Sequence, residues 1–133
     1  MNDTLSTLDF KSVGSITFTE DGPLISLTST LSRGVVYAYT DSFGKVLYIG
    51  STSGCAAKRA RAHWAALKDP NHGGKVYNKR TPRWMEILKA HGKLELFERK
   101  SAETSFAGIP VCLNKTEESA LISKLNPVLN VSV

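Results

Sequence analysis

The stretch VVYAYTDSFGKVLYIGST, residues 35–52, decides the fold, because it has the pattern of two short strands around a turn. If the loop begins at Asp41 and ends at Gly44, Tyr37 lies directly opposite Tyr48. Side chains opposite each other in a hairpin share one face, with Cβ atoms about 5 Å apart. The stretch therefore predicts a hairpin that carries two neighbouring tyrosines on one face.

This register, which pairs Thr40 with Lys45, places an apolar set on the other face that suits a core. The set is Val36, Ala38, Leu47 and Ile49. The tyrosine face is then expected to look outward or into a cleft. It also carries Gly50, where a backbone or a phosphate would have room to approach. Aromatic cross-strand pairs also stabilise ordinary strands, so the tyrosine pair alone has a purely structural explanation.

The composition predicts a single globular domain with a basic surface. The chain has 133 residues, with 17 Lys and Arg against 12 Asp and Glu, and a formal net charge of +5. That length buries a core without disulfides or metals. The charge favours a polyanionic partner, although net charge alone is a weak signal.

Cysteine usage and the first residues predict a cytoplasmic protein. Cys55 and Cys112 are far apart and form no CxxC pair, which argues against a disulfide framework or a zinc ribbon. The opening MNDTLSTLDF lacks the basic start and long apolar stretch of a signal peptide. No apolar run approaches the roughly 20 residues that cross a bilayer.

The other segments alternate between strand and helix patterns. In chain order, they are a strand pair around an Asp-Gly-Pro turn at 15–27, a helix at 56–67 capped by Thr52 or Ser53, a polar loop at 68–80, a helix at 81–91, a strand at 93–100, a polar loop at 101–110, and a helix at 116–125 ended by Asn126-Pro127. The order predicts an α+β fold, with a small, mainly antiparallel sheet of about three strands flanked by helices, and a strand pair in front. Residues 1–33 are expected to be an N-terminal extension with a β-hairpin.

The basic helix carries an apolar stripe that should face the sheet, made of Ala57, Ala60, Trp64 and Leu67. Arg59 and His63 are four residues apart, hence stacked along one edge of that stripe. An Arg fork suits a phosphate, and His carries protons near neutral pH. The alternative is an ordinary solvated pair at the border of a packed face.

The last helix places a carboxylate in an apolar stripe, because Glu118 precedes Leu121, Ile122 and Leu125 at helical spacing. Glu117 points elsewhere. An inward carboxylate needs a cation, a metal ion or a set of donors. The helix dipole favours an acid in the first turn by about 0.3–1 kcal/mol, but this does not explain why the acid faces inward.

Together these residues resemble the GIY-YIG nuclease family. Four groups of residues, within 34–130, match its motifs: Val35-Val36-Tyr37 in the place of Gly-Ile-Tyr, Tyr48-Ile49-Gly50 intact, Arg59 and His63 as its R-x-x-x-H, and Glu118 with Asn130 in EESALISKLNPVLN as its closing pattern. Val35-Val36 departs conservatively from Gly-Ile. The leading segment gives a second resemblance, to small stand-alone phage enzymes of the endonuclease II type.

The resemblance implies a nuclease domain at 34–133 that hydrolyses DNA phosphodiesters with one metal ion. Glu118 would hold Mg²⁺ or Mn²⁺, and Arg59 would clamp the scissile phosphate. Tyr37 would be the general base, although a tyrosine with a pKa near 10 is a poor base at neutral pH. His63, Tyr48, a metal-bound water or Lys45 would lower that pKa or take the proton onward. Asn130 would support the site.

The expected partner is double-stranded DNA. The candidate contacts are Lys58, Arg61, Lys75, Lys79, Arg80 and Arg83. Residues 75–84 mix cations and aromatics as nucleic-acid surfaces do, and also as solvated loops do. One active site cuts both strands only by assembling or acting twice, so a homodimer or homotetramer is possible. The competing functions are a DNA-binding module of the same fold that does not cleave, and a small basic RNA-binding protein.

Overall fold

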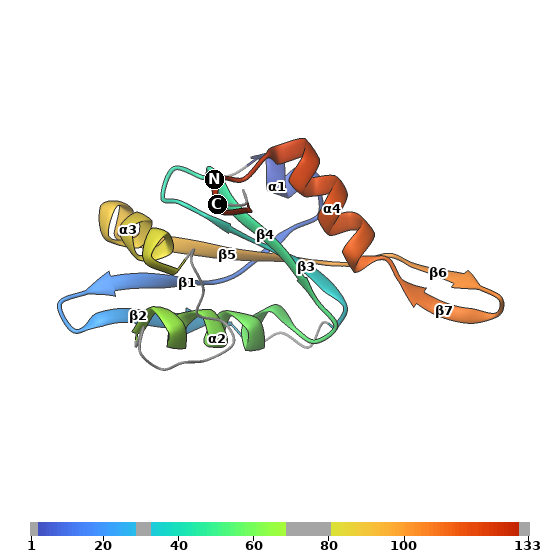
Figure 1. Cartoon of the computed structure of the whole chain (residues 1–133), viewed down its shortest axis with the longest axis horizontal. Helices are drawn as coiled ribbons and strands as arrows, with labels where there is room; N and C mark the ends of the chain where they lie inside the picture. The colour runs from blue at the N-terminus through green and yellow to red at the C-terminus, as the bar shows by residue number, and fades with distance from the viewer. Residues whose placement is uncertain (1–2, 29–32, 69–80, 131–133) are drawn as a thin grey trace.

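The computed structural model describes residues 3–28, 33–68 and 81–130. Its centre is a five-stranded antiparallel sheet in the order β2-β1-β5-β3-β4, with helices on both faces (Figure 1). The sheet strands are β1 (Lys11–Thr19), β2 (Gly22–Leu27), β3 (Val35–Thr40), β4 (Val46–Thr52) and β5 (Lys93–Lys100). The predicted α+β class is confirmed.

Helices, a third hairpin and a final turn make up the other described elements. They are α1 (Asp3–Thr7), α2 (Ala56–Lys68), α3 (Thr81–His91), β6 (Glu103–Phe106), β7 (Ile109–Cys112), α4 (Asn114–Leu125) and a final 3-10 turn (Val128–Asn130). In the described residues no helix has both the length and the apolar character needed to cross a membrane.

The sheet has five strands because the N-terminal strand pair joins it. β1 pairs with β5 from Lys11–Glu98 to Thr17–Lys93, so the first hairpin continues the sheet. The predicted number of about three strands is therefore too low. The turn of this hairpin is also shorter than predicted, because Gly22 and Pro23 already belong to β2. The division into an N-terminal extension at 1–33 and a nuclease domain at 34–133 stays a prediction.

Strand β3 is buried on both faces. Of the two expected surroundings of the tyrosine face, solvent or a cleft, the outward one is therefore wrong. α2 and α3 cover the face of Tyr37 and Tyr39, which are 2% and 0% exposed. α1 and α4 cover the other face, where Val36, Ala38 and Ile49 pack against Leu5, Phe10 and Leu121. A strand covered on both sides is buried at every residue, as β3 is.

The register of the β3–β4 hairpin differs from the predicted one. Tyr37 pairs with Gly50, Tyr39 pairs with Tyr48, and an irregularity then brings Thr40 opposite Val46. The observed partner of Tyr37 lies two residues beyond the predicted one. Because a register change of two residues leaves side-chain direction unchanged, the tyrosines keep their common face. The bulge moves Leu47 from the predicted apolar set into the tyrosine-side core.

Asp41 explains where the loop closes. Its Oδ1 accepts hydrogen bonds from the amides of Phe43 and Lys45, both at 2.9 Å, and its own amide donates to the Lys45 carbonyl at 3.0 Å. Lys45 is thus held by Asp41 inside the loop and does not pair with Thr40. A short acceptor side chain at a turn makes this closure, and strand alternation alone does not reveal it.

Three other predictions on local structure are wrong. Residues 101–110 were expected to be a loop, but β6 and β7 form a hairpin there, with Ala107 and Gly108 at positive φ in its turn. α2 begins at Ala56, so neither Thr52, which ends β4, nor Ser53 caps it. α4 begins at Asn114, two residues before the predicted start.

Candidate active site

Aromatic rings from four elements meet on one face of β3 and β4. The rings belong to Tyr37 and Tyr39 of β3, Tyr48 of β4, His63 of α2 and Trp84 of α3. The His63 ring centroid lies 5.9 Å from that of Tyr37 and 6.1 Å from that of Tyr48. Trp84 is 7% exposed and belongs to the core. The rings of Tyr39, Tyr48 and His63 thus surround the Tyr37 ring, with centroids 5.9 to 6.2 Å from it.

α2 packs through the predicted stripe, and this places Arg59 at the edge of the cluster. Ala57, Ala60 and Leu67 are buried against the sheet, while Arg59 is exposed. Arg59 lies within reach of the Tyr37 hydroxyl and acts on its pKa. Because its side chain is exposed, the guanidinium donors are also available to a phosphate.

The pKa of Tyr37 is raised well above its usual value. Burial is the largest cause, and the neighbouring Tyr48 raises the pKa further. The hydrogen bond and the charge of Arg59 lower the pKa, and the negative charge of Glu118 raises it. Tyr37 is therefore a neutral phenol over the physiological pH range.

Glu118 reaches the same point from the other face of the sheet. Its Oε1 accepts a hydrogen bond of 2.5 Å from the Ser51 hydroxyl, and its charge acts on Tyr37. Ser51 pairs with Val36, so its side chain lies on the side covered by α4. β4 is an edge strand, and the site spans this edge, with Arg59 on one side and Glu118 on the other.

Glu117 has a different role from Glu118. Its Oε1 lies 3.3 Å from Nε of Arg99, and its Oε2 accepts a hydrogen bond of 2.9 Å from the Ala102 amide. These contacts fasten the start of α4 to the end of β5 and the segment after it. The two adjacent acids thus point to different surroundings, in line with the sequence pattern that singled out Glu118.

The donor set fits a magnesium site that substrate completes. In the part of the chain that the structure describes, no three His, Cys, Asp or Glu residues form a metal-binding group. Mg²⁺ typically keeps several waters and binds one or two carboxylates together with substrate phosphates. Glu118, with the hard oxygen of Ser51 beside it, is compatible with such a site.

His63 is half-buried and neutral. Burial, followed by the positive charge of Arg59, lowers the pKa of His63 from 6.5 to about 4. Its Nδ1 lies 3.0 Å from the Tyr39 hydroxyl. His63 therefore lies beside Tyr37, the expected base. Because it is less solvated than a surface histidine, its imidazole stays neutral at lower pH.

Asn130 holds the final 3-10 turn against the edge strand. Its Oδ1 accepts from the Ile49 amide and its Nδ2 donates to the Ile49 carbonyl, both at 2.8 Å. The side chain thus completes the hydrogen bonds of β4 one residue before Gly50. This contact supports the strand that carries Tyr48 and Gly50.

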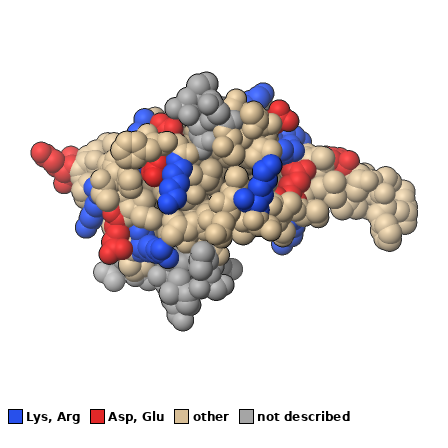
Figure 2. Space-filling model, turned by 90° about the horizontal axis from the view of Figure 1, so that it is seen from above, with Lys and Arg blue, Asp and Glu red and all other residues tan. Residues whose placement is uncertain are grey.

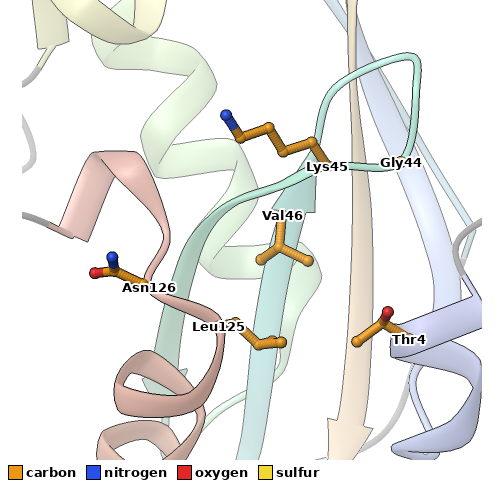
Figure 3. A pocket seen from close by; sticks show the side chains of 6 residues that line it. All are labelled: Thr4, Gly44, Lys45, Val46, Leu125 and Asn126. Carbon is orange, nitrogen blue, oxygen red and sulfur yellow. The ribbon is translucent and has the colours of Figure 1, made fainter.

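Lys45 lies elsewhere. It lines a small pocket of about 220 Å³ with Thr4, Leu125 and Asn126, between the β3–β4 loop and the ends of α1 and α4 (Figure 3). The groups that shift the pKa of Tyr37 are Tyr48, Arg59 and Glu118, and Lys45 is not among them. Among the groups expected to lower the pKa of Tyr37 or to take its proton, Lys45 therefore has the least support.

The predicted DNA contacts are only partly described. Lys58, Arg61 and Arg83 are exposed, while Lys75, Lys79 and Arg80 lie outside the described residues. Figure 2 shows Lys and Arg spread over one face among acidic and uncharged residues. Sequence reasoning missed Tyr39 and Ser51. The alternation in VVYAYT places Tyr39 on the face of Tyr37, but Ser51 carries no comparable local signal.

The fold is one found among DNA-cleaving enzymes. The restriction endonuclease Hpy188I, solved with product DNA, matches 98% of this chain and 85% of its own, with a TM-score of 0.55 and 13% identity. The E118A mutant of bacteriophage T4 EndoII is more similar, with a TM-score of 0.75 and 19% identity over 97% of this chain and 98% of its own. At these identities the likeness establishes the fold. No protein-family model and no curated protein sequence matches the chain.

Proposed function

We propose that this chain is a metal-dependent DNA endonuclease of the GIY-YIG type. The observation that carries the proposal is the convergence of Tyr37, Arg59 and Glu118 from β3, α2 and α4 at one sheet edge. Each of these three side chains has a function in hydrolysing a phosphodiester. Each is also a polar or charged group that costs free energy in or beside a core unless it has a partner. The likeness to the two DNA-related structures supports the same class of activity.

Arg59 binds the scissile phosphate in this proposal. Its guanidinium is exposed, always charged, and near enough to Tyr37 to lower the pKa of that phenol. Donors at this place stabilise the charge that develops on the phosphate oxygens. The nearness of Arg59 to Tyr37 would bring the phosphate close to the base.

Tyr37, once it has given up its own proton, takes the proton from the attacking water. Glu118 would hold Mg²⁺ or Mn²⁺, which would supply positive charge to neutralise the phosphate and the departing oxygen. At present the negative charge of Glu118 raises the pKa of Tyr37. A cation on that carboxylate would remove this effect and lower the pKa of Tyr37, while burial, the largest cause of the raised pKa, would remain. Tyr48, His63 and Asn130 hold this arrangement together.

A DNA-binding module of the same fold is the second candidate. The buried and neutral Tyr37 favours it, because a protonated phenol does not act as a base. The proposed partner is double-stranded DNA in both cases, in the cytoplasm of a bacterial or phage-infected cell. A nuclease of this kind that cuts both strands would either assemble as a homodimer or homotetramer or act twice.

The test is cleavage of supercoiled plasmid with Mg²⁺ or with EDTA, for the wild type, Glu118→Gln and Glu117→Gln. We expect nicked or linear DNA from the wild type with metal only, and none from Glu118→Gln. Glu117→Gln is the matched control, since it changes the adjacent acid but loses only the contacts to Arg99 and Ala102. It should still cut the plasmid.

Other outcomes separate the candidates. A wild type that shifts DNA on a native gel without cutting it favours the binding module. Equal cutting by the wild type and Glu118→Gln contradicts the assigned metal ligand, or reveals a contaminating nuclease.

A further inference from the structure

Tyr39 has a fixed place in the aromatic cluster. It is fully buried, and its ring meets the Tyr37 ring edge-on at 6.1 Å and the Trp84 ring edge-on at 4.8 Å. A ring held on two sides cannot turn its hydroxyl away. That hydroxyl is directed at His63, 3.0 Å from Nδ1.

The protonation states of the two partners determine the direction of this hydrogen bond. Burial raises the pKa of Tyr39 well above its ordinary value, so its O–H keeps the proton. His63 is neutral, because burial and Arg59 lower its pKa to about 4. Among the described residues, Nδ1 of His63 is the hydrogen-bond partner found for the Tyr39 hydroxyl. A buried O–H without an acceptor is costly, so Tyr39 donates and Nδ1 accepts.

We propose that Tyr39 is a positioning residue that holds His63 in the tautomer with its proton on Nε2. In this tautomer the Nδ1 lone pair is used by Tyr39, and Nε2 carries a hydrogen. His63 therefore offers a hydrogen-bond donor and no free lone pair. To accept a proton, it would first have to break its bond to Tyr39.

The tautomer of His63 limits what this residue can do in the proposed reaction, and that role rests on the proposed function. His63 was one of the groups expected to take the proton of Tyr37. The Nε2–H tautomer excludes that role and leaves His63 with Nε2–H as a hydrogen-bond donor. The proton of Tyr37 must then leave through Tyr48 or water.

The test is an NMR measurement that needs no cleavage. Long-range ¹H–¹⁵N correlation spectra of the imidazole rings distinguish a protonated nitrogen from one with a free lone pair. His63→Gln assigns the signals, and spectra are recorded at pH 7 for the wild type, Tyr39→Phe and Tyr48→Phe. Tyr39→Phe keeps the buried ring and removes only the hydroxyl. Tyr48→Phe is the matched control, since it removes the hydroxyl of another ring next to His63.

We expect protonated Nε2 and unprotonated Nδ1 in the wild type and in Tyr48→Phe. In Tyr39→Phe the Nδ1 signal should shift and both tautomers should appear. A proton on Nδ1 in the wild type overturns the proposal. So does a Tyr39→Phe spectrum identical to that of the wild type.

A cleavage assay adds the link to function. Tyr39→Phe should lower kcat by about tenfold to a hundredfold with little change in KM, as loss of a partner that orients a histidine does at other sites. If the wild type does not cut DNA, the proposed function fails, while the spectra still decide the tautomer. If the tautomer is as expected but kcat is unchanged, the role assigned to His63 as a donor is wrong.

Discussion

Single residues decide how closely the site is packed, and Gly50 is the clearest case. The Tyr37 side chain lies directly over Gly50, where an added Cβ would overlap the hydroxyl and the ring atoms beside it. Both residues are buried, so the ring has no free space to move into. The glycine of the Tyr48-Ile49-Gly50 motif is therefore explained by the tyrosine, although the sequence suggested space for a phosphate.

We predict that Gly50→Ala lowers stability by about 1–3 kcal/mol, the typical cost of overpacking. It should also displace the Tyr37 hydroxyl from Arg59 and reduce cleavage strongly. Urea denaturation and plasmid cleavage measure the two effects. Gly54→Ala is the control, because its added Cβ meets only Thr52 Oγ1, at an ordinary 3.7 Å. Equal activity of Gly50→Ala and the wild type would contradict the assigned position of Tyr37.

His63 makes stability depend on pH. Its pKa is 6.5 in the unfolded chain and about 4 in the folded protein, so between these values the unfolded state binds more protons. Stability contributed by the neutral imidazole is present above about pH 6.5 and is lost as the pH falls toward 4. Each pKa unit corresponds to about 1.4 kcal/mol, which makes the full loss on the order of 3 kcal/mol.

The measurement is urea denaturation at several pH values from 4 to 7, for the wild type and His63→Gln. Other titrating groups are common to both proteins, so the difference isolates His63. We expect the variant to show a flatter dependence in this range. Parallel curves would show that His63 titrates normally in the folded protein.

At the scale of elements, the edge strand β4 is completed by a side chain. Asn130 makes the two hydrogen bonds to Ile49 that a further strand would otherwise make. This links the last turn of the chain to a strand that comes 81 residues earlier. The contact ties the closing motif of the sequence to the strand that carries Tyr48.

We predict that Asn130→Ala destabilises the protein by about 1–3 kcal/mol, because it leaves the Ile49 amide and carbonyl without partners. Hydrogen exchange of the Ile49 amide should become faster. Asn130→Asp keeps an acceptor for that amide and should preserve more of its protection. Unchanged exchange in Asn130→Ala would show that the turn does not hold β4.

At the scale of the whole molecule, the β6–β7 hairpin projects from the body (Figure 1). Phe106 and Ile109 are 75% and 61% exposed, and the segment 103–112 contains no Lys or Arg. Figure 2 shows the same projection without basic residues on the visible side. A surface that lacks cations is poorly suited to phosphates, so we do not assign it to DNA contact.

We predict that Phe106→Ser and Ile109→Ser change the free energy of unfolding by less than about 0.5 kcal/mol, as exposed substitutions usually do. Leu121→Ser, which alters the buried face of α4, should cost several times more. Thermal denaturation of the three variants makes the comparison. A large loss of stability in Phe106→Ser would mean that the hairpin covers apolar surface in solution.

The basic residues on the α2 and α3 side should determine the salt dependence of DNA binding. Lys58→Ala, Arg61→Ala and Arg83→Ala should each weaken binding uniformly across sequences and reduce the salt slope by about one. Fluorescence anisotropy with Glu118→Gln protein measures binding without cleavage. Lys124→Ala, on the helix that covers the opposite face, is the control. An affinity that does not change with salt would contradict an electrostatic DNA surface.

Local patterns predicted much of this molecule. Alternation placed Tyr37 and Tyr48 on one face, because a register error of two residues leaves side-chain direction unchanged. Helical spacing identified the buried stripe of α2 and separated Glu118 from Glu117. The residues that resemble GIY-YIG motifs lie on β3, β4, α2, α4 and the final 3-10 turn. These features could be predicted because each depends on residues close together in the chain.

The amino-acid sequence by itself thus determined the α+β class, the main helices and strands, and the candidate residues on them. Only the tertiary structure decided that β1 pairs with β5, that the tyrosine face is buried, and that Tyr39 contacts His63 and Ser51 contacts Glu118. The last two contacts join residues 24 and 67 positions apart. Local periodicity records which way a side chain points, but not which distant element lies there to meet it. That choice depends on packing the whole chain around both faces of one sheet.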